Sequence, residues 1–97
     1  MSVRFLDIAR QELDEAVVWY EAQREQLGRD FLDALDRAVR RIVALPLSCV
    51  ELEPGLRRCL LVRFPYGVVY GLDGEDIVVV AIAHLHREPR YWVERAG

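Results

Sequence analysis

The feature that most constrains the fold is an apolar run near the C-terminus. Residues 77–83 read IVVVAIA, so both sides of an extended segment would be apolar there. Because alternate side chains of a strand point to opposite faces, such a run predicts a strand that is covered on both faces. We expect this central strand to run from about Asp76 to His86. Regular alternation would place on one of its faces Val78, Val80, Ile82, His84 and His86.

Turn signals divide the segment before this strand. Asp73–Gly74 is a strong hairpin signal, so a second strand is expected at residues 66–72. A third is expected at residues 57–63, which precede Phe64–Pro65. Residues 47–56 are expected to form a loop with a turn at Pro54–Gly55. A short β-prone segment at residues 2–6 is expected to pair with the central strand.

The first half of the chain predicts a helical hairpin. Apolar residues recur at helical spacing over residues 8–27 and again over residues 29–45. Gly28 is expected to break the two helices apart, and Pro46 to end the second one. Glutamates such as Glu12 and Glu21 are expected on the outer, solvated face of the first helix. Only one residue separates the helices, so they should pack antiparallel.

These elements predict an α+β fold with the order β-α-α-β-β-β. The helical hairpin should pack on one face of a twisted, mostly antiparallel sheet. A chain of 97 residues is expected to form a single domain that spans residues 1–97.

The composition excludes several classes of protein. All 13 basic residues are arginine, and the net charge of −3 with a pI near 5.3 counts against tight, sequence-independent binding of nucleic acid. No apolar run approaches the roughly 18–20 residues of a membrane span, and no secretory signal is recognisable, so a cytoplasmic location is expected. Cys49 and Cys59 are expected to be reduced and partly buried. No cofactor is predicted.

Most residues that could act chemically follow the central strand. Arginine, tyrosine and tryptophan at a sheet edge could hold phosphate and stack a base, or anchor a protein partner. A third interpretation is structural, with Trp92 closing the core. The candidate target- or partner-binding residues are Arg57, Arg58, Arg63, His86, Arg87, Arg90, Tyr91 and Trp92. His84 and His86 have only Glu88 as a nearby third ligand, so no metal site is predicted.

Two segments of the chain carry a family resemblance. Residues 57–70 (RRCLLVRFPYGVVY) and 77–92 (IVVVAIAHLHREPRYW) resemble the RelE/ParE superfamily of bacterial type II toxins, which includes ParE-like plasmid stabilisation proteins. The most telling pieces are the turn Arg63–Phe64–Pro65–Tyr66, Tyr70, and the ending His84-x-x-Arg87-x-Pro89. Trp19–Tyr20 and the run Gly28–Arg29–Asp30–Phe31–Leu32 fit as well, so the resemblance covers essentially the whole chain.

The resemblance implies the same helical hairpin on a sheet, and a cognate antitoxin encoded by the adjacent gene. Its C-terminal part would wrap the toxin by helix-in-groove contact or strand addition. RelE-like members cleave ribosome-bound mRNA, whereas ParE-like members poison DNA gyrase. A nuclease would be expected to use Arg87, Tyr91 and His84. Gly67 stands where nuclease members commonly carry arginine, so the sequence favours a ParE-like gyrase inhibitor over an enzyme. A non-toxic binding module is the third alternative.

Overall fold

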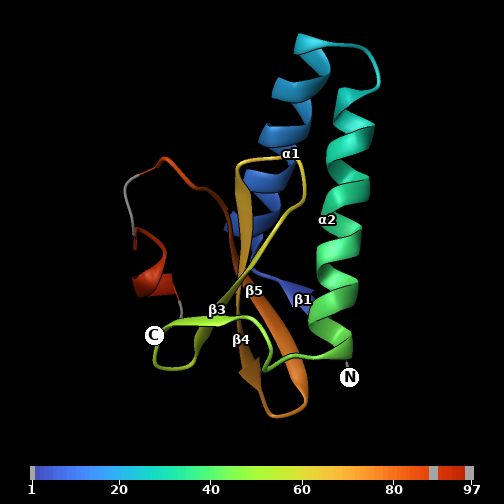
Figure 1. Cartoon of the computed structure of the whole chain (residues 1–97). Helices are drawn as coiled ribbons and strands as arrows, with labels where there is room; N and C mark the ends of the chain where they lie inside the picture. The colour runs from blue at the N-terminus through green and yellow to red at the C-terminus, as the bar shows by residue number, and fades with distance from the viewer. Residues whose placement is uncertain (1, 88–89, 96–97) are drawn as a thin grey trace.

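The computed structural model describes residues 2–87 and 90–95 and confirms an α+β fold. A helical hairpin is followed by strands that join the N-terminal strand in one five-stranded sheet (Figure 1). Pro89, which belongs to the family resemblance, lies outside the described residues. Along the chain the elements are β1 (Val3–Phe5), α1 (Asp7–Gln23), α2 (Leu27–Ala44), β2 (Val50–Glu53), β3 (Leu56–Leu60), β4 (Tyr66–Asp73), β5 (Asp76–His84) and a short 3-10 helix (Val93–Arg95).

The sheet has the strand order β1-β5-β4-β3-β2. β1 pairs with β5 in parallel, and the other three pairings are antiparallel. The expected contact between the first strand and the apolar strand is therefore confirmed. The hairpin at Asp73–Gly74 is also confirmed, because Asp73 pairs with Asp76 and Gly74 takes a φ of 62° that suits glycine.

The prediction missed one strand and extended two others too far. The predicted loop 47–56 contains the edge strand β2, and Gly55, with a φ of 83°, lies in the turn between β2 and β3. β3 ends at Leu60, so Arg63 lies in the following turn. β5 ends at His84, because the chain then turns and the His86 amide donates to Nδ1 of His84 (3.0 Å).

A β-bulge interrupts the regular alternation of β5. Val69 pairs with Ala81 while Tyr70 pairs with Val79, so Val80 has no direct partner on β4. The extra residue moves the side chains that follow to the opposite face. Ile82 therefore packs on the helix side with Ile77 and Val79, not on one face with Val80 as predicted. A strand that is apolar on both faces gives no sequence signal for such a bulge.

The helix boundaries also differ from the prediction. α1 ends at Gln23, the break lies at residues 24–26 with Gln26 at a φ of 74°, and Gly28 lies inside α2. A Cβ on Gly28 would come within 2.9 Å of the Val17 carbonyl oxygen, so this glycine allows close approach of the two helices. Glu21 accepts hydrogen bonds from the Gln26 and Gly28 amides (3.1 and 3.0 Å). It therefore caps the start of α2 and is exposed, as predicted.

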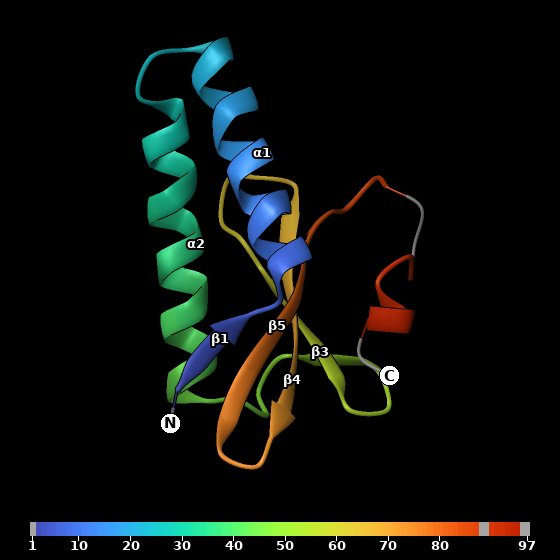
Figure 2. The same ribbon diagram turned by 180° about the vertical axis from the view of Figure 1, so that it is seen from behind.

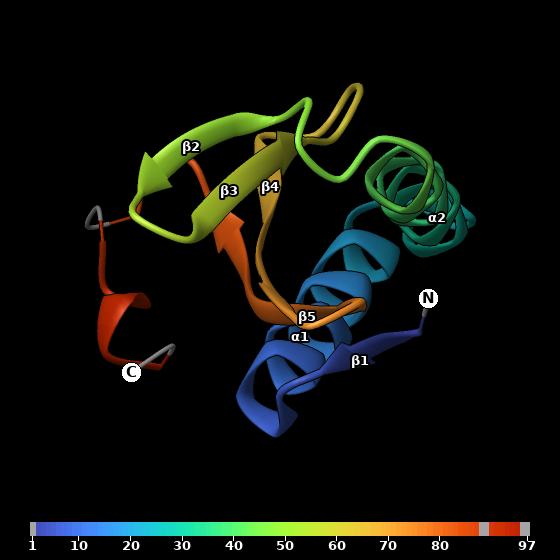
Figure 3. The same cartoon turned by 90° about the horizontal axis from the view of Figure 1, so that it is seen from below.

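The helical hairpin covers one face of the sheet. The residues described after β5, 85–87 and 90–95, are called the C-terminal segment here, and this segment and α2 lie on opposite sides of the sheet (Figures 2 and 3). Four aromatic rings pack together near the loop that joins the two helices: Tyr20, Phe31, Phe64 and Tyr66. This group unites the helical and strand pieces of the family resemblance in one cluster. Neither helix of the described chain combines the length and the apolar character that crossing a bilayer requires.

Candidate functional site

Side chains replace a neighbouring strand along half of β5. β1 pairs only with residues 77–79, which leaves the later backbone groups of β5 to find other partners. The Ile82 amide donates to Oε1 of Glu12 (3.1 Å), and the Val80 carbonyl accepts from Nη1 of Arg95 (3.1 Å). Backbone groups that leave water need such partners. Glu12 from α1 and Arg95 from the C-terminus therefore complete the edge of the sheet.

Glu12 connects α1 to three residues of the C-terminal segment. Its carboxylate accepts two hydrogen bonds from Arg95 (2.8 and 3.2 Å) and one from the Tyr91 hydroxyl (2.9 Å). Arg87 lies 3.6 Å away, and the Glu12 side chain is only 11% exposed. Hydrogen bonds between charged partners are stronger than neutral ones. A single carboxylate thus holds the C-terminal segment against β5.

The predicted outer position of Glu12 was wrong. Glu12 follows the buried Ala9 by three residues and precedes the buried Ala16 by four, so it lies at the margin of the apolar stripe. That spacing is the signal that could have identified it. Arg95 was not singled out either, and the sequence carries no local signal for its contact with Glu12.

The Tyr91 side chain contacts positive charges with its ring and the negative charge of Glu12 with its hydroxyl. Its ring face contacts the guanidinium groups of Arg87 (3.9 Å from Cζ to the ring centroid) and Arg95 (5.0 Å). Burial, followed by the hydrogen bond to Glu12 and its negative charge, raises the pKa of Tyr91 to about 12, although both arginines act in the opposite direction. At neutral pH the hydroxyl is therefore protonated and serves as a hydrogen-bond donor.

Two small pockets flank this segment, and His84, Arg87 and Tyr91 line both. The first has a volume of about 250 Å³ and lies on the side of α1, with Trp19 and Tyr66 in its wall. The second has a volume of about 240 Å³ and lies on the side of β2 and β3. Its other lining residues are Leu52, Glu53, Arg58, Ala83, Leu85, Arg90 and Trp92.

Arg58 reaches the second pocket across a glycine. A Cβ on Gly67 would lie 2.7 Å from Cγ and 2.8 Å from Cδ of Arg58, closer than such atoms approach one another. The bare backbone of Gly67 therefore accommodates the aliphatic stem of this arginine. Nuclease members commonly carry an arginine at the position of Gly67. In this chain the side chain of Arg58, which comes from β3, lies over the backbone at that position.

The other two arginines of the predicted group lie elsewhere. Arg57 points to the opposite face, where its Nη1 donates to the carbonyls of Leu47 (3.0 Å) and Cys49 (2.8 Å). Arg63 lies 3.6 Å from Asp30 at the end of the helical hairpin. Of the three arginines, only Arg58 reaches the second pocket, because alternation sends Arg57 to the other face of the sheet.

Arg90 and Trp92 have different surroundings. Arg90 is exposed and forms an ion pair with Glu53 of β2. Trp92 is only 5% exposed and packs against Leu56, Val69 and Val80 on the face of the sheet away from the helices. Trp92 therefore closes a second, smaller core, in agreement with the interpretation of this residue as a structural one.

The two histidines lie at the end of β5. His84 is half-buried, and its ring contacts the Tyr66 ring edge-on, with 5.0 Å between the ring centroids. His86 is exposed, and its ring centroid lies 5.3 Å from that of His84. Within residues 2–87 and 90–95, no three His, Cys, Asp or Glu side chains gather closely enough to hold a metal ion. Glu88, considered as a third ligand, lies outside the described residues.

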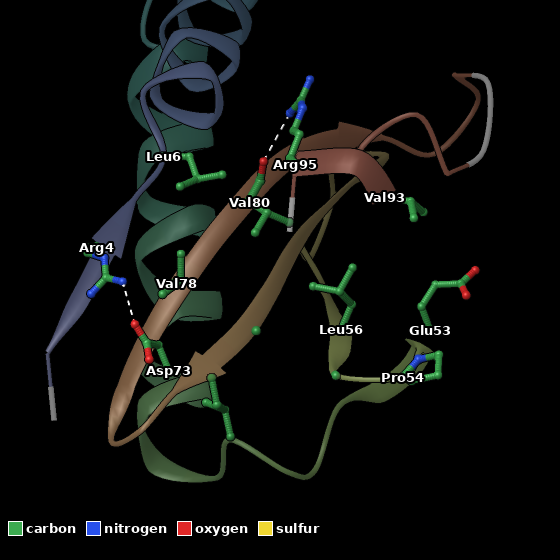
Figure 4. Close-up of a pocket in the computed structure, with 13 residues that line it drawn as sticks. Arg4, Leu6, Glu53, Pro54, Leu56, Asp73, Val78, Val80, Val93 and Arg95 are labelled. Atoms are coloured by element: carbon green, nitrogen blue, oxygen red, sulfur yellow. Dashed lines mark hydrogen bonds and ion pairs between the residues drawn. The ribbon is translucent and has the colours of Figure 1, made fainter. Parts of the chain in front are cut away.

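A groove of about 670 Å³ lies on the face of the sheet away from the helices (Figure 4). Leu56, Val78 and Val80 form its apolar floor. An ion pair between Arg4 and Asp73 (2.9 Å) lies at one end, and Arg95 beside Val80 lies at the other. One end of the groove therefore lies where Arg95 contacts β5.

The comparisons with known proteins identify the family. Residues 3–89 match the family model of the ParE toxin of type II toxin–antitoxin systems (parDE). This chain belongs to the ParE toxin family. A solved structure of the chromosomal ParDE toxin–antitoxin system from P. aeruginosa shares the fold, with a TM-score of 0.64 and 21% sequence identity over 89% of this chain and 97% of that one. No curated protein sequence matches the chain.

The family match and the candidate site overlap only in part. Glu12, Arg58 and Arg87 fall within the ParE match at residues 3–89. Tyr91, Trp92 and Arg95 lie beyond its end, yet they supply the contacts that hold the last segment of the chain on Glu12 and β5. The site thus combines positions of the family model with a C-terminal segment that follows it.

Proposed function

We propose that this protein is the toxin of a bacterial type II toxin–antitoxin system, that it inhibits DNA gyrase in the cytoplasm, and that a cognate antitoxin neutralises it. The observation that carries the proposal is membership in the ParE family over residues 3–89. ParE-like toxins are expected to act by binding gyrase, and the site around Glu12 has the properties of a binding surface.

The surroundings of Tyr91 support binding over RNA cleavage. A general acid or base works best when its pKa is near the working pH. The Tyr91 hydroxyl is bound to Glu12, and its pKa is raised to about 12, so it exchanges its proton poorly at neutral pH. Arg87 is likewise occupied by Glu12 and the Tyr91 ring. The RelE-like alternative, an mRNA endonuclease that uses Arg87, Tyr91 and His84, therefore receives no support from this geometry.

We propose that the gyrase-binding surface is formed by exposed and half-buried residues around the second pocket. Arginine and aromatic side chains contribute most to many protein interfaces. Trp92 would support this surface from beneath, because it is buried against β5. The residues proposed to contact the target are Arg58, Arg87, Arg90 and Tyr91, which line the pocket, and His86, whose ring lies beside that of His84.

We further propose that the groove beside the C-terminal segment receives part of the antitoxin. Its floor is apolar, and its rim carries both Arg4 and Asp73, so an amphipathic segment could bury an apolar face there and pair charges at the edges. Because Arg95 lines the groove and contacts Glu12, occupation of the groove would also act on the toxin surface.

A supercoiling assay tests the proposed target. Increasing amounts of the purified protein should abolish supercoiling of a relaxed plasmid by gyrase, and the product of the adjacent reading frame should restore it. Unchanged supercoiling at a large molar excess would reject gyrase as the target. Two parallel measurements separate the alternatives: cleavage of mRNA on translating ribosomes would favour the nuclease, and normal growth on expression without a partner would favour a non-toxic module.

A further inference from the structure

The two cysteines of the chain lie at one end of the β2–β3 pairing, with Cys49 directly before β2 and Cys59 inside β3. Val50 pairs with Arg58 and Glu51 with Arg57, so the residue before β2, Cys49, continues this register opposite Cys59. Directly opposite residues of antiparallel strands have Cα atoms about 4.5–5.5 Å apart. A disulfide accommodates Cα separations of about 4.4–6.8 Å. The backbone positions therefore suit a bond between the two sulfur atoms.

The side chains of both cysteines face the same compartment. Cys59 is buried in the core between the helices and the sheet, and Cys49 packs against that core from its margin. The Cys49 side chain is close enough to act on the Cys59 thiol as a hydrogen-bond partner. Both cysteines are free, so the structure describes the reduced pair.

The surroundings of the pair differ at the two sulfur atoms. Burial raises the pKa of Cys59, while the guanidinium of Arg41, 3.5 Å from its Sγ, acts in the opposite direction and favours the thiolate. Cys49 is only half-buried and is the cysteine that a dissolved oxidant reaches first. The Arg57 side chain holds the Cys49 carbonyl (2.8 Å), which fixes the backbone at this position.

We propose that Cys49 and Cys59 form a reversible disulfide when the protein meets a peroxide. The Cys49 thiolate attacks one oxygen of hydrogen peroxide and the O–O bond breaks, which leaves a sulfenic acid on Cys49. The other oxygen leaves as hydroxide and becomes the first water by taking up the proton that the Cys49 thiol had released. The Cys59 sulfur then attacks the Cys49 sulfur, the S–O bond breaks, and hydroxide leaves as a second water with the proton of the Cys59 thiol. The two thiols lose two electrons in total, and the peroxide gains them. A thiol reductant reverses the bond by exchange.

The bond would fix the edge of the sheet beside the candidate site. It would close a loop around the β2–β3 hairpin, from which Glu53 forms an ion pair with Arg90 and Arg58 lines the second pocket. Disulfides in reducing compartments are usually transient and responsive to oxidants. The proposal is independent of the target of the toxin.

Mass spectrometry of the folded, full-length protein tests this inference. The reduced protein is treated with hydrogen peroxide, quenched with an alkylating reagent, and analysed intact and after digestion. We expect a mass lower by two hydrogen atoms, no alkylation, a cross-link between the peptides of Cys49 and Cys59, and full reversal by dithiothreitol. Alkylation of both thiols, added oxygen atoms without a cross-link, or only disulfide-linked dimers would each overturn the proposal.

Single variants locate the steps of the reaction. In Cys59→Ala, Cys49 should stop at the sulfenic acid and be captured by dimedone, whereas in Cys49→Ser the buried Cys59 should stay largely unoxidised. Arg41→Gln should slow formation of the disulfide several-fold relative to Arg40→Gln, a neighbour that contacts Asp36 instead. Because Arg41 also holds the Leu60 carbonyl, circular dichroism must first show that this variant is folded. A cross-link that forms in denaturant but not in the folded protein would contradict the proposal.

Discussion

The two faces of the sheet are covered in different ways. On one face, α1 and α2 bury a continuous core in which Phe31, Ala38 and Ile42 are fully inaccessible to solvent. On the other face, Trp92 covers a smaller cluster, and a groove of about 670 Å³ stays open beside it. The helix face thus supplies most of the apolar burial, and the other face presents a surface that a partner can reach.

The kind of contact also differs between the two faces. The helices are held by apolar packing, which is not directional, whereas the C-terminal segment is held by the packing of Trp92 and, in addition, by hydrogen bonds to Glu12. The hydrogen bonds to Glu12 depend on charge and geometry, so substitution or a competing partner can change them without unfolding the core. The following predictions test this division of roles.

The largest effect is expected on the helix face. Phe31→Ala should lower the free energy of unfolding by about 3–5 kcal/mol, because it leaves a cavity among Tyr20, Phe64 and Tyr66. Urea denaturation monitored by circular dichroism measures this. The matched control is Leu32→Ala on the partly exposed side of the same helix, which should cost less than about 1 kcal/mol. Equal losses in the two variants would contradict the assignment of the main core.

An intermediate effect is expected for the carboxylate that holds the C-terminal segment. Glu12→Gln keeps the shape but removes the charge paired with Arg95 and Arg87, so it should cost about 1–3 kcal/mol. Hydrogen exchange should show faster exchange of the Ile82 amide, which donates to Glu12. The exposed Glu15→Gln serves as the control and should change neither quantity. An unaltered exchange rate of Ile82 in Glu12→Gln would show that the carboxylate does not complete the sheet edge.

The pH dependence of Tyr91 reports the same contact. Its pKa is raised from near 10 to about 12, so folding favours the neutral hydroxyl. This contribution to stability is fully present below the unfolded pKa near 10 and is lost as the pH rises through about 12. Alkaline titration of tyrosinate absorbance, with Tyr91→Phe to assign the signal, measures it. In Glu12→Gln the pKa of Tyr91 should fall but stay above its usual value, because burial is the largest cause.

The smallest effect is expected for an exposed ion pair on the helix face. Arg40 and Asp36 lie 2.9 Å apart on α2 with most of both side chains in solvent. Arg40→Gln should therefore change the free energy of unfolding by about 0.3–0.5 kcal/mol, and salt should reduce this difference. A loss as large as that of Glu12→Gln would mean that burial does not distinguish the two contacts.

The sequence predicted the elements better than their details. Strong local signals, such as the Asp73–Gly74 turn and the apolar run at residues 77–83, placed the hairpin and the neighbour of β1 correctly. The edge strand β2 was missed because it is short and because Pro54–Gly55 suggested a loop. The bulge at Val80 was missed because an all-apolar strand reads the same in either register.

The site was predicted less completely than the fold. Arg58, Arg87 and Tyr91 were among the expected residues, and they line one pocket. The contacts of Glu12 and Arg95 join positions 83 residues apart, and spacing along the chain carries no information about such pairs. The family resemblance predicted the membership that the match over residues 3–89 shows.

Gyrase inhibition by two matched double variants tests the central claim most directly. Arg87→Ala with Arg90→Ala alters exposed, ion-paired arginines of the C-terminal segment, and Arg29→Ala with Arg40→Ala alters exposed, ion-paired arginines of α2. In a supercoiling assay, the first pair should weaken inhibition at least about tenfold, the size expected for loss of interface arginines, and the second should leave it unchanged. Full inhibition by the first pair together with loss of inhibition by the second would contradict a functional surface on the C-terminal segment.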